Sequence, residues 1–353
     1  MSTDLRQSLP LPSRSRPVVI FGAGSIVSDA HLPAYARLGF TVAGLYDPDQ
    51  AKAQALAAAH GTRAFASVAE ATSFGTGAVY DLATPPAAHP DILQALPEGA
   101  VAILQKPMGS DLAQADRILH ICRARGLKVA VNFQLRYAPN VMALRDAMDR
   151  GLLGDLVDVD ALVAVDTPWH LWAFLADLPR VEILLHSIHY LDTVRALLGD
   201  PRGVHARTLG HPSSTVSNTR SAMILDYGPQ IRCALSINHN HAFGRKFQAC
   251  EFRICGTKGA AYLKMGVNLD YPKGEPDELW LNLNGGWRQV PLQCNWFLEA
   301  FLGRFTQVMR FAVGEDAVLE GSVEDAWLTM ALVEAAYESN AAPAHPIRKK
   351  PDA

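Results

Sequence analysis

Lys106 occupies a position in which a lysine side chain could take part in proton transfer. It belongs to residues 105–109, which directly follow the apolar run Val101–Leu104. Pro107 lacks a backbone N–H donor and has a fixed φ, so it constrains the direction of the chain beside the lysine. An ammonium group held there could hydrogen-bond a hydroxyl group and assist its deprotonation. A solvated surface lysine is the alternative interpretation.

Glu182, His186 and His189 form a second set of ionisable side chains that could act together. They are spaced four and then three residues apart, so they share one face of a helix that we expect over residues 182–198. A histidine suits proton transfer near neutral pH, and Asp192, beyond His189 on the same helix, could fix its tautomer. A solvated helix face, or a buried histidine with satisfied hydrogen bonds, would explain the spacing without any chemistry.

The histidines also raise the question of a metal site. Glu182, His186 and His189, together with His239 and His241, carry ligand types that zinc and iron accept. Neither group has the spacing of a standard ligand motif, and His239 and His241 would share a face of any strand in which they lay. We therefore expect no metal ion.

The segment over residues 18–47 has the spacing of a dinucleotide-binding unit. An apolar run leads into Gly22 and Gly24, and the next expected strand ends at Asp47. Glycines at this turn let backbone amides approach a pyrophosphate, and the following helix directs its positive end at the same anion. Asp47 could bind the ribose hydroxyls and would repel a 2′-phosphate, which favours NAD over NADP. Val27 departs from the pattern, since Gly or Ala is usual there, and an ordinary tight turn is the alternative.

Polar and aromatic side chains near these residues could hold a substrate. Asn132, Gln134 and Arg136 follow the last strand expected in the first half of the chain, and could hydrogen-bond hydroxyl groups or cap the loop. Trp169 and Trp172 lie in an expected loop before the histidine helix. Their ring faces suit stacking on the C–H surface of a sugar, and packing between domains is an equally good explanation.

Two patterns of secondary structure divide the chain near residue 135. Up to residue 133, short apolar runs alternate with helical ones, which indicates a parallel, doubly wound sheet. Beyond it, strand-like runs succeed one another without helices between them, which indicates an open, mainly antiparallel sheet. These runs are 203–209, 221–226, 231–238, 247–255, 260–265, 278–282 and 287–291.

We therefore expect an α/β chain with two domains. An N-terminal Rossmann domain, 17–134, precedes a C-terminal α+β domain, 135–340, with flexible tails over 1–16 and 341–353. The ligand site should lie in a cleft between the two domains.

Composition excludes several other classes of protein. The 353 residues carry a formal net charge of −3, which argues against a nucleic-acid surface. No apolar segment approaches the roughly 20 residues of a membrane-spanning helix, and residues 1–17 contain no apolar core of a signal peptide. The five cysteines are scattered and lack CxxC spacing, so we expect free thiols and a cytoplasmic protein.

A series of short motifs runs through nearly the whole chain. They are Gly22-Ala23-Gly24 with His31-Leu32-Pro33, Thr84-Pro85-Pro86 with His89, Lys106-Pro107, His189-Tyr190-Leu191-Asp192, Gly256-Thr257-Lys258-Gly259 and Glu334-Ala335-Ala336-Tyr337-Glu338-Ser339. In this order they resemble the family of glucose–fructose oxidoreductase, inositol dehydrogenase and rhizopine catabolism proteins (Gfo/Idh/MocA). The resemblance implies oxidation of a ring hydroxyl of a sugar, sugar derivative or cyclitol with NAD or NADP. It also implies a homodimer or homotetramer assembled through the C-terminal sheet.

The resemblance assigns roles to individual residues. Lys106 matches the family's lysine, and His189 matches its acid/base histidine. The residues implied in cofactor binding are Gly22, Gly24, Ser25, Ile26, Asp47, Thr84, Pro85, His89, Gln105 and Lys106. Those expected to bind substrate are Asn132, Gln134, Arg136, Trp169, His186 and His189.

Two departures from the family pattern keep other functions open. The family's glutamate before the lysine is Gln105 here, and its frequent aspartate four residues before the histidine is Leu185. His186 could replace that carboxylate. A redox-neutral glycoside-cleaving enzyme with tightly held NAD and a non-catalytic NAD-sensing regulator are the two alternative functions.

Overall fold

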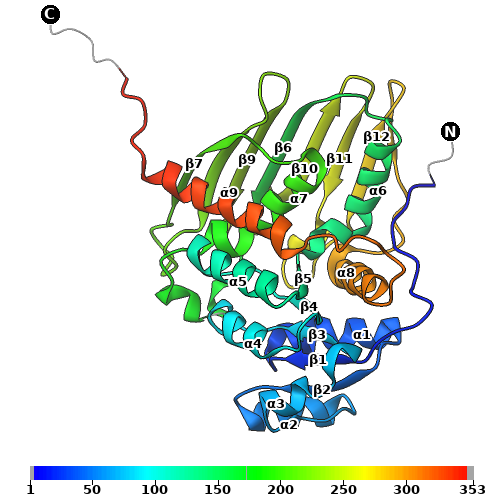
Figure 1. Cartoon of the computed structure of the whole chain (residues 1–353). Helices are drawn as coiled ribbons and strands as arrows, with labels where there is room; N and C mark the ends of the chain where they lie inside the picture. The colour runs from blue at the N-terminus through cyan, green and yellow to red at the C-terminus, as the bar shows by residue number, and fades with distance from the viewer. Residues whose placement is uncertain (1–3, 172, 348–353) are drawn as a thin grey trace, which may run out of the picture.

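The computed structural model describes residues 4–171 and 173–347. Two β-sheets form its framework, one from each half of the chain, and helices pack between and around them (Figure 1). Within the described residues, we find no helix with the length and apolar character needed to cross a membrane.

The N-terminal sheet is parallel and doubly wound, as predicted. Its five strands lie in the order β2-β1-β3-β4-β5. Strands β1, β3 and β4 are buried along their whole length, because helices cover both faces of the sheet. The strands are β1 (Val18–Phe21), β2 (Val42–Tyr46), β3 (Val79–Leu82), β4 (Val101–Leu104) and β5 (Lys128–Val131). The accompanying helices are α1 (Leu32–Leu38), α2 (Gln50–Ala59), α3 (Val68–Thr72), α4 (His89–Ala95) and α5 (Leu112–Ala124).

The C-terminal sheet has eight strands in the order β13-β12-β11-β10-β6-β9-β8-β7. All neighbours are antiparallel except β6 and β9, so the sheet is mixed and mainly antiparallel, as predicted. The central strand β6 was not among the predicted runs. The strands are β6 (Leu156–Ala164), β7 (Gly203–Leu209), β8 (Arg220–Asp226), β9 (Arg232–Asn238), β10 (Ala249–Gly256), β11 (Ala260–Lys264), β12 (Glu278–Asn282) and β13 (Trp287–Gln289).

Helices of the second half cover one face of this sheet and reach the first domain. They are α6 (Pro139–Asp149), α7 (Ile188–Leu198), α8 (Trp296–Ala312) and α9 (Val323–Ala341). Two segments are π-helical, Val27–His31 and Glu182–Ser187. Short 3₁₀ turns occur at Gly75–Gly77, Pro86–Ala88, Gln134–Tyr137, Trp169–Leu171, Ala173–Asp177 and Gly266–Asn268.

Helices α8 and α9 follow the domain boundary predicted near residue 135 in the sequence, but they pack against the first domain. Phe305 of α8 stacks on Tyr35 of α1 with ring centroids 4.3 Å apart, within a core that also contains β1 residues. On α9, Trp327 donates from Nε1 to Asp116 Oδ1 of α5 at 2.6 Å. The last helices therefore complete the nucleotide-binding half, because its sheet needs an apolar cover that its own sequence does not supply.

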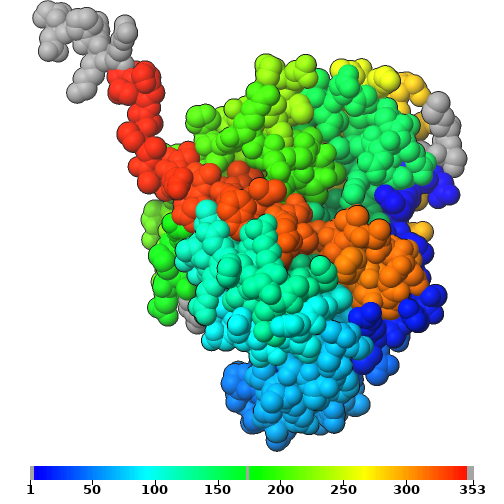
Figure 2. All heavy atoms as spheres, viewed as in Figure 1, coloured from blue at the N-terminus to red at the C-terminus, as the bar shows by residue number. Residues whose placement is uncertain are grey.

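The N-terminal segment also differs from the prediction of a flexible tail. Leu5 is only 5% exposed, and the backbone N–H of Arg6 donates to Asp146 Oδ2 at 3.1 Å. Ser13 donates to Glu315, and Arg16 donates to the Thr76 carbonyl in the first domain. Figure 2 shows this segment lying against the surface beside α8. It is a strap that contacts both halves of the chain. At the other end, Ile347 is 93% exposed.

Candidate functional site

The turn after β1 is built so that backbone can approach a ligand. Gly22 has a φ of +114°, and a Cβ there would lie 2.4 Å from the carbonyl oxygen of Ala83, so only glycine fits. Gly24, by contrast, has no atom within 4 Å of the position of a Cβ. Asp47, at the end of β2, accepts a hydrogen bond from the Ala23 N–H at 2.8 Å. The carboxylate therefore lies against the glycine turn, where a ribose next to a pyrophosphate is held in this fold.

These residues fit a dinucleotide cofactor. The space at Gly24 and the N-terminus of the following helix suit an anion. The buried Thr84 Oγ1, on the loop after β3, has no hydrogen-bond partner in the described structure, which is costly unless a ligand supplies one. Ser25 and Ile26 begin the helix and lie at the same edge of the sheet.

His89 has a different position from the one implied for a cofactor-binding residue. Its ring is buried, with Nε2 at 2.9 Å from the Thr84 carbonyl oxygen and Nδ1 at 3.5 Å from that of Met108. Burial lowers its pKa to about 4, so the ring is neutral at pH 7. A neutral imidazole carries one N–H, and the shorter contact of His89 is with the Thr84 carbonyl of the loop after β3, so the ring is directed at main chain.

A buried hydrogen-bond network lies beneath Gln105, and the sequence did not predict it. Asn132 donates from Nδ2 to Gln105 Oε1 at 2.9 Å, and the same nitrogen is 3.5 Å from His31 Nε2. His31 Nδ1 is 2.7 Å from Asp81 Oδ2, which also accepts from the Tyr35 hydroxyl at 2.8 Å. The spacing of His31 and Tyr35, one helical turn apart, was the signal available. Asn132 is thus held with its amide nitrogen engaged, while its Oδ1 has no partner among the described residues.

Lys106 extends from the first domain to the second. Its Nζ donates to the carbonyl oxygen of Leu185 at 2.8 Å. Burial lowers the pKa of Lys106 to about 8, since the carbonyl offers a dipole but no full negative charge. Leu185 stands where the family often has an aspartate, and it contacts Lys106 through its main-chain carbonyl.

His186 and His189 lie beside the ammonium group. Burial lowers the pKa of His189 well below its usual value, and the charge of Lys106 lowers it further. The pKa of His186 is lowered by burial and by the positive charges of His239, Lys106 and His189. Both rings are therefore neutral at pH 7, and the buried His189 Nδ1 has no hydrogen-bond partner in the described structure.

Asp192 and Arg136 do not have the positions that we expected. Arg136 donates from Nε and Nη2 to both carboxylate oxygens of Asp192, at 2.7 and 2.6 Å. Its Nη1 pairs with Asp325 at 2.7 Å, and Thr329 donates to Asp192 at 2.9 Å. The carboxylate therefore does not orient His189. Arg136 joins the 3₁₀ turn after β5 to α7 and α9, which leaves Gln134, with a buried and unpartnered Oε1, as the polar group of that turn.

Glu182 also lies apart from the proton-transfer residues. Glu182–Ser187 is π-helical, with hydrogen bonds between residues i and i+5. The carboxylate is fully buried and accepts hydrogen bonds from the hydroxyl groups of Ser187 and Ser221. Its Oε1 is also 3.5 Å from His239 Nε2.

Trp169, His186 and His239 form a cluster of three rings, which we call the ring cluster. The Trp169 ring centroid lies 5.0 Å from that of His186 and 5.5 Å from that of His239, and the two imidazoles are 4.9 Å apart. Thr167 Oγ1 is 2.8 Å from His239 Nδ1. The sequence pointed to His239 only as a metal ligand. His241 binds elsewhere, to the carbonyl of Lys246, and Trp172 lies outside the described residues.

No group of three or more histidine, cysteine and acidic side chains that could hold a metal ion occurs in the described residues. All five cysteines are free. The candidate site consists of the ammonium group of Lys106, the imidazoles of His186, His189 and His239 and the indole of Trp169, and the glycine turn and Asp47 follow other strands of the same parallel sheet.

Comparison with known proteins identifies the family. Residues 16–133 match the model of an oxidoreductase family with an NAD-binding Rossmann fold, and residues 141–262 match the GFO/IDH/MocA C-terminal domain. The chain is 25% identical to 1,5-anhydro-D-fructose reductase of Ensifer adhaerens over 85% of this chain and 91% of the relative. It is 33% identical to inositol 2-dehydrogenase of Leifsonia xyli over 40% of this chain and 42% of that protein.

Solved structures show the same fold over 93% of the chain. An oxidoreductase from Agrobacterium radiobacter, in complex with NAD+, L-tartaric acid and magnesium, has a TM-score of 0.79 at 21% identity and covers 93% of this chain and 97% of its own. Levoglucosan dehydrogenase, in complex with NADH and levoglucosan, has a TM-score of 0.78 at 18% identity and covers 93% of this chain and 98% of its own. With an NAD-binding Rossmann domain followed by the characteristic C-terminal domain, the chain belongs to the Gfo/Idh/MocA family of oxidoreductases.

Proposed function

We propose that this protein oxidises a hydroxyl-bearing ring carbon of a sugar, sugar derivative or cyclitol with NAD. The main support is the contact between Lys106 Nζ and the Leu185 carbonyl, at 2.8 Å, because it brings a lysine of the nucleotide-binding half to the helix that carries His189. The names of several relatives agree with this substrate class, among them inositol 2-dehydrogenase and D-apiose dehydrogenase.

The two residues have complementary tasks in this proposal. Lys106 Nζ donates to the hydroxyl oxygen of the substrate and stabilises the negative charge that develops as the proton leaves. His189, neutral at pH 7 because its pKa is lowered, takes up that proton. A bound nicotinamide supplies the acceptor for the hydride. Gln134 and Asn132, each with an unpartnered oxygen in the described structure, orient the other hydroxyl groups.

Asp47 is the proposed basis of cofactor choice. Its carboxylate is held at the glycine turn by the Ala23 N–H, and its charge opposes the 2′-phosphate of NADP. Thr84, Pro85 and Gln105 follow β3 and β4 at the same edge and would border the nicotinamide half of NAD, with NADP bound more weakly.

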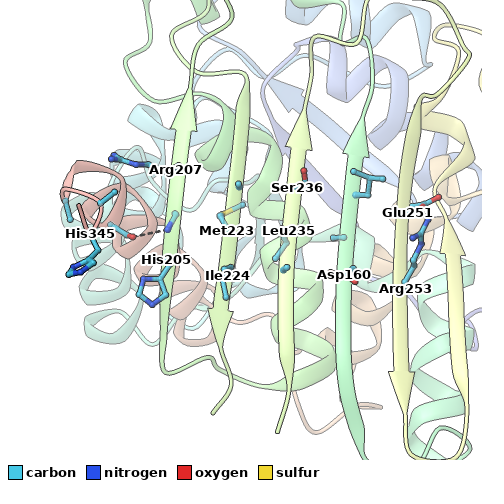
Figure 3. Close-up of a pocket in the computed structure, with 18 of the residues that line it drawn as sticks. Asp160, His205, Arg207, Met223, Ile224, Leu235, Ser236, Glu251, Arg253 and His345 are labelled. Atoms are coloured by element: carbon cyan, nitrogen blue, oxygen red, sulfur yellow. Dashed lines mark hydrogen bonds and ion pairs between the residues drawn. The ribbon is translucent and has the colours of Figure 1, made fainter. Parts of the chain in front are cut away.

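The open face of the C-terminal sheet is the proposed interface of a homodimer or homotetramer. A hollow of about 840 Å³ lies on it, and Figure 3 shows side chains of five strands along this face, with His345 of the C-terminal segment at one edge. Ile224 and Leu162 are 56% and 37% exposed there, and apolar side chains on an open sheet favour association.

The free cysteines fit our proposal of a cytoplasmic protein.

An absorbance assay for NADH tests the proposed function. Purified protein is incubated with NAD or NADP and a panel of sugars, sugar acids and inositols. We expect NADH from at least one compound, and a fluorescence titration should give tighter binding of NAD than of NADP. Tighter binding of NADP would contradict the role of Asp47, and failure to bind either dinucleotide would contradict the proposed function.

A further inference from the structure

The ring cluster contains hydrogen-bond donors without acceptors. The buried Trp169 Nε1, which can only donate, has no partner among the described residues. His239 is 3% exposed, and its Nε2 lies 3.5 Å from Glu182 Oε1 without forming a hydrogen bond in the described structure. A buried donor left without a partner is costly, so these two atoms indicate a ligand group that accepts hydrogen bonds.

The nearby carboxylates cannot supply the missing acceptors. The Glu182 carboxylate already accepts hydrogen bonds from two serine hydroxyl groups, and it lies beside His239. Asp192 is occupied by Arg136 and Thr329. Position 185, from which an aspartate could have faced the site, contributes a leucine and a main-chain carbonyl. The site is consequently rich in donors and lacks a free carboxylate.

The charges around the ring cluster also favour an anion. His186 faces Lys106, His189 and His239, and their positive charges add to the effect of burial in lowering its pKa. Glu182 is the negative group behind His239. An anion bound beside the rings would be attracted by the Lys106 ammonium group and would favour the protonated form of an imidazole. Its binding should therefore take up a proton and should strengthen as the pH is lowered.

We propose that Trp169, His186 and His239 bind a carboxylate group of the substrate, so that the substrate class is a sugar acid, an aldonate or a uronate. This inference rests on the proposed function, because the hydroxyl that is oxidised would meet Lys106 and His189. A carboxylate has only acceptor oxygens when ionised, which matches the unpartnered indole and imidazole nitrogens. A neutral sugar hydroxyl would use these donors less well, since it needs an acceptor for its own proton.

The test compares acids with their uncharged counterparts on the NAD-loaded protein. Calorimetric titration and NADH formation are measured with D-glucuronate and D-glucose, D-galacturonate and D-galactose, and D-gluconate and D-glucitol. We expect one acid to exceed its neutral partner in affinity and in kcat/KM by roughly 10- to 100-fold, as for hydrogen bonds to a charged group. Titration in buffers of different ionisation enthalpy should show proton uptake with that acid.

Two conservative variants and one control locate the effect. Trp169→Phe keeps an aromatic ring and removes only the N–H donor, and His239→Asn keeps a partner for Thr167 while removing Nε2. Each should reduce the preference for the acid by about tenfold and leave NAD binding unchanged. His120→Asn, at an exposed position of α5, should leave the preference as it is.

The outcomes separate this inference from the function on which it rests. NADH formed from the neutral compounds with a kcat/KM equal to or above that of the corresponding acids would overturn the carboxylate site and leave the dehydrogenase intact. An acid that binds through Trp169 and His239 without any NADH would support the carboxylate site and contradict the proposed function. Absence of binding by every acid, in a protein that binds NAD, would overturn the carboxylate site.

Discussion

At the scale of single residues, the ammonium group of Lys106 is held by a peptide carbonyl instead of a carboxylate. A carboxylate at this distance would keep the pKa of the lysine high, whereas burial beside a neutral dipole lowers it to about 8. The ammonium form is present at pH 7 but is lost within the accessible pH range. The lack of a carboxylate at this contact in the described structure should therefore be visible in how activity depends on pH.

The pH profile of kcat/KM tests this pair of residues. Activity requires neutral His189, whose pKa is lowered well below its usual 6.5, so activity should fall only as the pH drops well below 6.5. It also requires charged Lys106, so it should fall as the pH rises through about 8. The His189→Gln variant should lose the acid limb and keep the basic one. An acid limb at pH 6.5 or above in the unaltered protein would contradict the assignment.

Sequence reasoning identified residue types at this scale but could not foresee their partners. Lys106 and His189 were predicted to act together, and this remains a prediction; the charge of Lys106 contributes to lowering the pKa of His189. We predicted that Arg136 would bind the substrate and that Asp192 would fix the tautomer of His189, but the two side chains pair with each other. The sequence contains no signal for that pairing, because it joins a 3₁₀ turn to α7 across a span of 56 residues.

At the scale of elements, the turn after β1 contains one glycine that the packing requires, Gly22, and one that it does not, Gly24. A Cβ at Gly22 would meet the Ala83 carbonyl of the loop after β3, whereas a Cβ at Gly24 would enter open space. Sequence spacing predicted the turn, but it could not distinguish the two glycines, since only the packing of β1 against β3 does so.

Substitution of the two glycines should have opposite consequences. Gly22→Ala should lower the free energy of unfolding by about 2 kcal/mol or more, because of its positive φ and the backbone clash. Gly24→Ala should change it by less than about 0.5 kcal/mol and weaken NAD binding by at least about tenfold, since its methyl group would occupy the space proposed for the pyrophosphate. Urea unfolding and a fluorescence titration measure the two effects. Unchanged NAD affinity in Gly24→Ala would contradict the proposed placement.

The role predicted for Glu182 from helical spacing was wrong, and Glu182 belongs to the π-helical segment Glu182–Ser187. The α-helical rule grouped Glu182 with His186 and His189 for proton transfer, but the Glu182 carboxylate is buried and accepts from the hydroxyl groups of Ser187 and Ser221. Strand spacing was more reliable, and β7 and β12 have the predicted bounds. The alternating pattern of the strands could be recognised in the sequence, whereas a local change from α-helix to π-helix leaves no such pattern and could not be predicted.

At the scale of the whole molecule, the two halves are joined by more than the chain that links them. Helix α8 supplies part of the core of the nucleotide-binding half, and the N-terminal strap contacts both halves. The predicted boundary near residue 135 is therefore a change of pattern along the sequence and does not divide the packing. Lys106 of one half meets Leu185 of the other within this joined body, and the proposed chemistry depends on that meeting.

The most direct test of the central claim is the comparison of NAD binding with turnover in Lys106→Met. Methionine keeps much of the volume of the side chain and removes the charge and the donor at the junction. With the best substrate of the panel, we expect turnover to fall by roughly 10²- to 10⁴-fold, while NAD affinity stays within about threefold of that of the unaltered protein. The control is Lys128→Met, at an exposed position at the start of β5, which should leave both turnover and NAD affinity unchanged. Turnover that survives the loss of Lys106, or that is lost only because NAD no longer binds, would contradict the account.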